Sequence, residues 1–169
     1  MNRAALALGL ATALLGGFTA ADAHAAASPT YRIVNNITGG SLMPQDYGEN
    51  SNDGIAMYAW DTSDTRGADV WRFTLVSDGS VMIRNIRTAK CLKPGGAFSG
   101  LTYLTQGTCN DSLEFQWTFQ HRASDDQYKI VSRSSQQAIS PIEGRDLNEL
   151  VVLDAPSNIA RNWWSVVEV

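Results

Sequence analysis

The chain has 169 residues, with 13 basic and 17 acidic side chains, a net charge of −4 and two cysteines. This length suits one domain of ordinary size. The absence of any basic block argues against nucleic acid as a partner.

The N-terminal stretch from Met1 to about Ala27 is predicted to be a secretory signal peptide. Arg3 supplies a positive charge, and the apolar run that follows, Ala4 to Leu15, has twelve residues. Such a run is too short to cross a bilayer core of about 30 Å as a helix, which disfavours the alternative of an uncleaved membrane anchor. Small-x-small cleavage motifs end at residues 23, 25 and 27. We therefore expect a secreted protein with one mature domain over residues 28–169, which would pass through the periplasm in a Gram-negative bacterium.

The rest of the chain consists of short apolar runs separated by turn residues, a pattern typical of all-β proteins. Four landmarks recur in the same order in three copies. The copies open with the runs 31–34, 81–84 and 128–131, and an aliphatic-x-Pro follows at 42–44, 92–94 and 139–141. A third apolar run follows at 55–58, 101–104 and 150–153, and each copy closes on Trp-x-apolar at Trp71, Trp117 or Trp164. These tryptophans are 46 and 47 residues apart. A conserved order and spacing predicts three repeats of one structural unit that share a core.

Repeats of this length that close near a Gln-x-Trp position resemble the ricin-type β-trefoil lectins, and the resemblance covers Tyr31 to Val169. It implies an all-β fold, a β-trefoil of three pseudo-repeats in which the recurring tryptophans occupy equivalent buried positions. Copy two matches best, because it retains both cysteines and Trp-Thr-Phe. The motif glutamine is replaced in all three copies, by Asp69, Phe115 and Asn162.

Such degenerate repeats after a signal peptide are similar to the A and C subunits of cytolethal distending toxins. Those subunits are trefoil proteins that bind host cells and deliver a nuclease subunit. The resemblance leaves open whether this chain is A-like or C-like.

Cys91 and Cys109 are predicted to form a disulfide, because two cysteines in an exported chain usually pair. Their separation of 18 residues is similar to that of the within-repeat disulfide of ricin-type lectins. The alternative, a nucleophilic thiol, is disfavoured, since His121 is the one histidine left if cleavage falls after His24.

Catalysis and metal binding have little support in the sequence. His121 follows the copy-two Trp-Thr-Phe, where a surface hairpin turn is expected. Nothing pairs two carboxylates across a cleft, as a glycosidase requires. The segment 46–54 is rich in oxygen ligands but lacks the spacing of a calcium loop, so a turn is the better interpretation. We expect a non-enzyme with no metal and no cofactor.

The sugar sites implied by the resemblance use an Asp after the Cys-apolar pair, an aromatic on the next strand and an Asn before Gln-x-Trp. The matching positions are Met43, Tyr58 and Ala68 in copy one, Lys93, Leu104 and Glu114 in copy two, and Ser140, Leu153 and Arg161 in copy three. No copy keeps the Asp or the Asn, and by this count only copy one keeps an aromatic. Galactose-type binding in the usual pockets is therefore not expected, and Met43, Lys93 and Ser140 should matter little.

Four aromatic residues lie off the repeated core positions and are the candidates for a binding surface: Tyr47, Tyr58, Trp60 and Trp163. The stretch Met57–Trp60 resembles the Val-Trp-Ala-Leu of toxin A subunits, where an exposed aromatic patch begins. Tyr58 could equally be a half-buried strand residue. The spacing also allows Trp163 and Trp164 to exchange roles.

These features favour a non-catalytic binding or delivery subunit of a secreted toxin. Its expected partners are a nuclease-like subunit and a second trefoil subunit, with a host cell-surface glycan or lipid as a further ligand. The alternatives are a free-standing lectin with non-standard sites, or a trefoil inhibitor or structural secreted protein.

Overall fold

The computed structural model of the protein describes residues 28–76 and 78–169. The predicted signal peptide lies outside these residues. The twelve strands are β1 (Tyr31–Asn35), β2 (Ser41–Pro44), β3 (Met57–Trp60), β4 (Trp71–Leu75), β5 (Val81–Asn85), β6 (Cys91–Phe98), β7 (Leu101–Gly107), β8 (Gln116–Arg122), β9 (Gln127–Ser132), β10 (Ala138–Pro141), β11 (Glu149–Asp154) and β12 (Trp164–Glu168). Four single-turn 3₁₀ helices are η1 (Gln45–Gly48), η2 (Thr62–Asp64), η3 (Leu113–Phe115) and η4 (Ala160–Asn162). None of the described helices has the length and hydrophobicity needed to cross a lipid bilayer.

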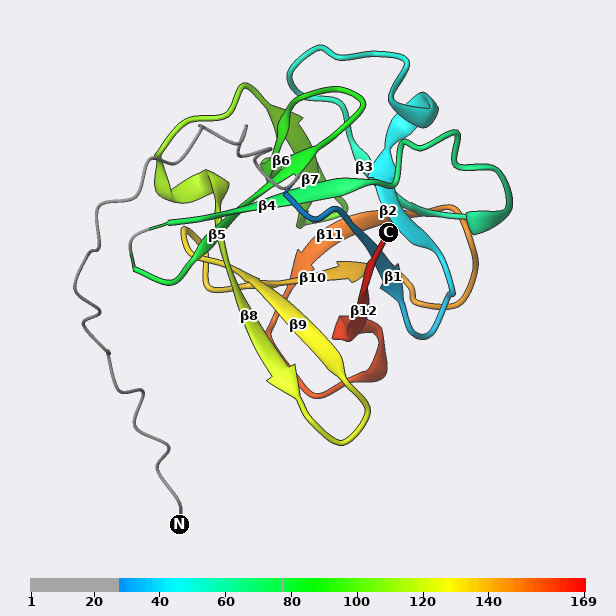
Figure 1. Ribbon diagram of the computed structural model, residues 1–169. Coiled ribbons are helices and arrows are strands. Elements are labelled where there is room, and N and C mark those ends of the chain that lie inside the picture. The colour runs from blue at the N-terminus through cyan, green and yellow to red at the C-terminus, as the bar shows by residue number, and fades with distance from the viewer. Residues whose placement is uncertain (1–27, 77) are drawn as a thin grey trace, which may run out of the picture.

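Six strands close into a barrel. The pairing runs β1–β4–β5–β8–β9–β12 and returns to β1, antiparallel throughout. The first and last strands therefore lie side by side (Figure 1), and Thr30 and Val169 extend this pairing through hydrogen bonds. Closure removes the free strand edges that would otherwise expose unpaired backbone groups.

Three hairpins cap the barrel: β2–β3, β6–β7 and β10–β11. They are joined to one another where β11 pairs with β3 and with β7, and where Ala56 bridges to Thr105. Each copy thus supplies two barrel strands and one cap hairpin, which confirms the predicted β-trefoil.

The three repeated tryptophans hold each cap hairpin to the barrel. Trp71, Trp117 and Trp164 are all 0% exposed. Each indole Nε1 donates to the main-chain oxygen of the aliphatic residue in the aliphatic-x-Pro of its own copy, at 2.8, 3.1 and 3.1 Å. A buried indole needs such a partner for its N–H. Trp164 and not Trp163 therefore occupies the core position of copy three.

A buried polar side chain sets the turn after the first strand of each copy. The Oδ1 atoms of Asn35 and Asn85 accept hydrogen bonds from the backbone N–H groups two and three residues further on. Their Nδ2 groups donate to carbonyl oxygens that precede Trp164 and Trp71. Ser132 takes the same position in copy three. Such side-chain bonds to the backbone favour turns, so all three copies reverse direction alike.

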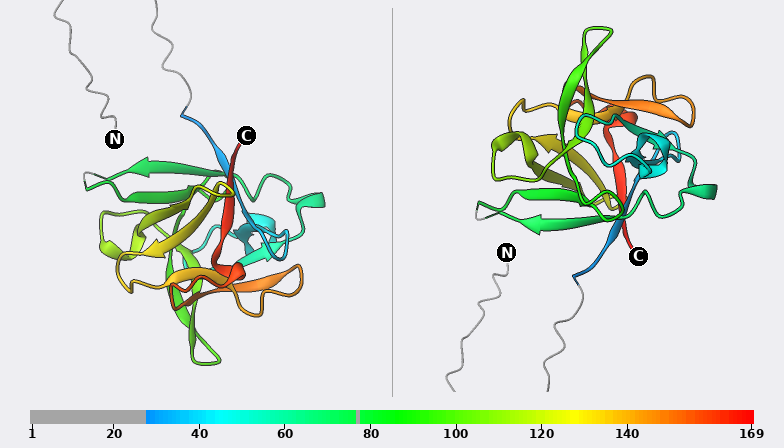
Figure 2. Two further views of the ribbon diagram at one scale, coloured as in Figure 1. Left: turned by 90° about the horizontal axis from the view of Figure 1, so that it is seen from below. Right: turned by 90° about the horizontal axis from the view of Figure 1, so that it is seen from above.

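The β6–β7 hairpin is longer than the other cap hairpins and projects from the body of the molecule (Figure 2). Its two tip residues, Ser99 and Gly100, have φ angles of 50° and 79°. Positive φ at both positions is typical of the tight turn that suits the twist of a two-stranded ribbon. This hairpin forms one side of the site described next.

Candidate functional site

A pocket of about 560 Å³ opens in copy two beside the β6–β7 hairpin. Its other walls come from the segment around η3 and from the copy-one loop 50–54. Gln106 lies on β7 and is fully buried. Its Nε2 group donates hydrogen bonds to the carbonyl oxygens of Asn50 and Asn52, at 3.1 and 2.9 Å. The main-chain oxygen of Gln106 accepts from the N–H of Gly54 at 2.8 Å. These bonds fasten the copy-one loop to β7, so the pocket forms at the junction of two copies.

Two glycines form a pocket wall that has no side chains. The pairing of β6 with β7 shifts register between Pro94 and Ala97, where Gly95 and Gly96 both lie opposite Tyr103. A Cβ on Gly95 would lie 2.3 Å from a Thr105 methyl carbon, and one on Gly96 would lie 2.7 Å from the Tyr103 hydroxyl. The bulge therefore requires glycine at both positions, and the Tyr103 ring packs against bare backbone.

An ion pair lines the pocket beside this wall. The Lys93 ammonium lies 3.0 Å from the Glu114 carboxylate, and the two side chains are 27% and 42% exposed. The Lys93 ammonium also lies 5.4 Å from the centre of the Phe115 ring. An ammonium donates hydrogen bonds and a carboxylate accepts them, so the pair presents both functions to a ligand. Lys93 and Glu114 occupy the positions where the family pattern has its Asp and Asn.

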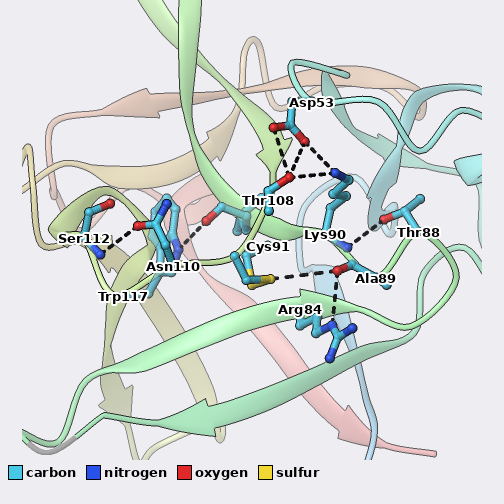
Figure 3. Close-up of a disulfide and its surroundings, with 12 residues drawn as sticks. Asp53, Arg84, Thr88, Ala89, Lys90, Cys91, Thr108, Asn110, Ser112 and Trp117 are labelled. Atoms are coloured by element: carbon cyan, nitrogen blue, oxygen red, sulfur yellow. Dashed lines mark hydrogen bonds and ion pairs between the residues drawn. A yellow bond between two sulfur atoms is a disulfide. The ribbon is translucent and has the colours of Figure 1, made fainter.

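Asp53, which lines the pocket, belongs to a second ion pair (Figure 3). The Lys90 ammonium lies 2.8 Å from the Asp53 carboxylate, and the Thr108 hydroxyl donates to the same carboxylate at 3.2 Å. The hydrogen bond from Lys90 is the main cause that lowers the pKa of Asp53 below its ordinary value. Asp53 therefore stays a charged acceptor in the pocket lining.

Cys91 and Cys109 form a disulfide, which confirms the predicted pairing. Their Cα atoms are 5.0 Å apart. The bond ties the segment after β7 back to the start of β6 (Figure 3), and this segment brings Thr108 and Asn110 to the pocket. The disulfide is thus part of the support of the site.

In copies one and three the residues that match Lys93 are buried. Met43 and Ala68 are fully buried in copy one, so apolar side chains fill the place of a sugar site. In copy three Ser140 is fully buried, and Arg161 pairs with Asp154 at 2.6 Å. Neither Met43 nor Ser140 can therefore meet a ligand as Lys93 can, and the loss of sugar binding in these copies stays a prediction.

Copy two differs from copies one and three. Leu104, which the repeat count placed at the aromatic position, is fully buried in the core, whereas its neighbour Tyr103 lines the pocket. In the register Thr105 lies opposite Lys93 as Tyr58 lies opposite Met43, so Tyr103 is a pocket aromatic at a position that the repeat count did not consider. Side chains alternate along β7, so Tyr103 faces the side opposite to the core-facing Leu104. In the sequence, Pro94-Gly95-Gly96 directly after Lys93 is the signal for the bulge in β6.

Three of the four predicted aromatic candidates come together around β3 and η1. The indole Nε1 of Trp60 donates to the Tyr47 hydroxyl at 3.0 Å, and the Tyr58 ring lies 5.7 Å from Trp60. The guanidinium of Arg66 covers Tyr47 at 4.7 Å. All three aromatic side chains are half-buried. Tyr47 has a φ of 55°, an uncommon backbone conformation for a bulky residue that persists only where the surroundings hold it.

The fourth candidate, Trp163, is buried, with 6% exposure. The Arg122 guanidinium and the Lys129 ammonium lie over its ring, at 4.1 and 4.7 Å from the ring centre. Burial, and to a smaller extent the charge of Arg122, lowers the pKa of Lys129. The expectation that Trp163 offers an outward-facing contact is therefore corrected: its indole packs beneath two cationic side chains.

His121 lies on β8 and is exposed, as the sequence predicts. It pairs with Asp126 at 2.8 Å and stacks on Tyr128 at 4.8 Å. Within residues 28–76 and 78–169, no three His, Cys, Asp or Glu side chains gather as a metal site would require. The absence of catalysis stays a prediction.

Comparison with known proteins places the fold among β-trefoils. The designed threefold-symmetric protein ThreeFoil superposes with a TM-score of 0.73 at 19% identity, over 83% of this chain and 99% of ThreeFoil. The exo-β-1,3-galactanase 1,3Gal43A of Clostridium thermocellum gives 0.75 at 20% identity, over 85% of this chain but only 31% of the enzyme. The cytolethal distending toxin of Haemophilus ducreyi gives 0.67 at 14% identity, over 82% of both chains. At such identities the likeness concerns the fold alone.

No curated protein sequence matches the chain. A family model does match: the model of the ricin-type β-trefoil lectin domain-like proteins aligns with residues 67–153. This segment is just over half of the chain and contains the whole β6–β7 hairpin and both cysteines. The protein therefore belongs to the ricin-type β-trefoil lectin domain-like family.

Proposed function

We propose that the protein is a non-catalytic carbohydrate-binding module whose ligand site is the copy-two pocket. The observation that carries this proposal is the combination of the Lys93–Glu114 pair, the Tyr103 ring and a side-chain-free glycine wall in one pocket. A sugar ring has hydroxyls on its edge and C–H groups on its faces. The ion pair can donate to one hydroxyl and accept from the next, while the aromatic ring can cover a C–H face.

The test begins with a glycan array to find a bound saccharide, whose affinity is then measured by calorimetry. Lys93→Ala should weaken binding at least tenfold, because a hydrogen bond to a charged group contributes about 1.5–3 kcal/mol. Tyr103→Ala should weaken it at least tenfold as well, because it removes the ring that covers a C–H face of the sugar. Ser140→Ala, at the corresponding position of copy three, should bind like the wild type. If Lys93→Ala and Tyr103→Ala both bind normally, the site assignment is wrong.

A second candidate function is that of a binding or delivery subunit of a secreted toxin. The Tyr47, Tyr58 and Trp60 cluster favours it, because such aromatic clusters are common anchors of protein interfaces. The similarity in fold between this chain and the cytolethal distending toxin of Haemophilus ducreyi supports this candidate. The proposed partners are a nuclease-like subunit and a second trefoil subunit, and a host glycan would occupy the copy-two pocket.

Co-expression with the products of neighbouring reading frames, followed by size-exclusion chromatography, tests this candidate. A Tyr58→Ala, Trp60→Ala double variant should lose assembly with a nuclease-like chain, while Lys93→Ala should keep it. If the double variant folds and assembles normally, the aromatic cluster is not the interface.

We also propose that the protein is exported with cleavage of its N-terminal segment. N-terminal sequencing of protein recovered from the culture medium should find a start at His24, Ala26 or Ser28. A start at Met1 would contradict the proposal.

A further inference from the structure

We infer that the ligand extends from the copy-two pocket into an adjoining groove, so that it is a neutral glycan of at least two sugar residues. This inference rests on the proposed function of the pocket and specifies its ligand class. The groove has a volume of about 430 Å³, and Tyr58, Ala97, Phe98 and Leu150 are among the residues that line it. It lies where the β6–β7 hairpin faces β3 and β11.

The groove and the pocket adjoin each other, because Gly54 and Tyr103 line both. A Cβ on Gly54 would meet no atom within 4 Å, so the boundary at this residue is open. The Tyr103 ring borders both spaces. The long β6–β7 hairpin supplies a wall to each of them, through Gly95 and Gly96 in the pocket and through Ala97 and Phe98 in the groove. A sugar bound over Tyr103 therefore has room for a linked residue beside it.

The two spaces differ in charge. Three charged side chains line the pocket, namely Asp53, Lys93 and Glu114, whereas none of the charged side chains in residues 28–76 and 78–169 lines the groove. A charged substituent on the second sugar would gain no counter-charge from this lining, whereas a neutral sugar needs none. The groove therefore selects a neutral second residue.

The groove lining also favours a sugar over an alkyl chain. Three of its side chains are aromatic: Tyr58, Phe98 and Tyr103. Phe98 is 53% exposed, so water reaches this wall. A sugar ring can cover an aromatic face with its C–H groups and keep its hydroxyls in water, whereas an alkyl chain in the same place would leave apolar surface exposed.

The experiment compares, by calorimetry, neutral monosaccharides with their β-linked disaccharides and octyl glycosides. The sugars are galactose, N-acetylgalactosamine, glucose and N-acetylglucosamine. A disaccharide should bind the wild type about tenfold or more tightly than its monosaccharide, a factor that corresponds to about 1.4 kcal/mol. Ala97→Trp, which fills the groove from an exposed position, should remove this gain and leave monosaccharide affinity unchanged. Leu75→Trp adds the same ring on β4, at a position that is 74% exposed, and should change neither affinity.

The outcomes separate this inference from the proposed function. Equal affinities for monosaccharide and disaccharide, both weakened by Lys93→Ala, would overturn the extended ligand and keep the pocket. An octyl glycoside that gains as much as the disaccharide would overturn the assignment of a second sugar. If Ala97→Trp abolishes binding and Lys93→Ala has no effect, the groove binds the glycan and the pocket assignment fails. Binding of no saccharide at all would overturn both.

Discussion

Single side chains hold the barrel and its cap together from within. Trp117 is the clearest case, because its indole is fully buried and donates to the carbonyl oxygen of Leu92. The ring thus supplies both apolar contact and a hydrogen bond to the Leu92 oxygen. The same contact recurs at Trp71 and Trp164, so each copy depends on one residue to fix its own hairpin.

Trp117→Ala should lower the free energy of unfolding by about 3–5 kcal/mol, since it leaves a cavity that the barrel cannot fully close. Trp117→Phe should cost less, because most of the apolar contact remains. The midpoint of urea denaturation measures both changes, with Leu113→Ala at a 53% exposed position as the control. A midpoint that barely moves for Trp117→Ala would contradict the core role.

Glu149 organises the loop before β11. Its carboxylate accepts from the backbone N–H groups of four successive residues, 143–146, at 2.7 to 2.8 Å. Burial raises the pKa of Glu149, but these four donors together outweigh burial and lower the pKa below its ordinary value of 4.5. The charged form is thus the one that the folded loop favours.

A depressed pKa stabilises the fold above the ordinary carboxyl value, and this contribution is lost as the pH falls through the lower folded-state value. Glu149→Gln should therefore be less stable than the wild type at neutral pH, and the difference should shrink as the pH falls below 4.5. Urea midpoints of both proteins across this range test the claim. A difference that grows towards acid pH would contradict it.

At the scale of elements, the β6–β7 hairpin distinguishes copy two from the others. Its glycine bulge leaves bare backbone beside the Tyr103 ring, and the disulfide fixes the chain that follows β7. Copies one and three lack both features. One hairpin thus carries the structural support of the candidate site.

A Cys91→Ala, Cys109→Ala double variant should lose about 3 kcal/mol of stability, the chain-entropy value for a loop of this size. Saccharide binding should also weaken, because Thr108 and Asn110 are no longer held at the pocket. Calorimetry with the saccharide found on the array measures the second effect below the denaturation midpoint. Wild-type affinity in a folded double variant would show that the disulfide does not support the site.

At the scale of the whole molecule, stability depends on closure of the barrel by strands from both ends of the chain. β1 pairs with β12 over five residues, and Thr30 and Val169 lie next to each other. Each copy contributes two strands to the barrel and one hairpin to the cap. We therefore expect the fold to tolerate chain termini at other turns of the barrel.

A circular permutant that joins Val169 to Thr30 and opens between Ala123 and Ser124, two exposed turn residues, should fold and unfold cooperatively. Opening between Ile130 and Val131, which are buried in β9, should prevent folding. Circular dichroism and urea denaturation of the two permutants measure this contrast. Cooperative unfolding of both, or of neither, would contradict the role of closure.

The sequence by itself determined the repeat period, the all-β trefoil, the three core tryptophans and the cysteine pair. These features depend on the order and spacing of residues along the chain. They can be read without knowing which side of a strand each side chain faces. Only the tertiary structure decided that Tyr103 and not Leu104 faces the pocket, because the register of β7 in the sheet sets which of two neighbouring side chains enters the core. It also brought Asp53 of copy one to Lys90 of copy two, and placed Trp163 beneath Arg122 and Lys129. Such contacts join residues far apart in sequence and arise from strand register and barrel closure, which no local pattern records.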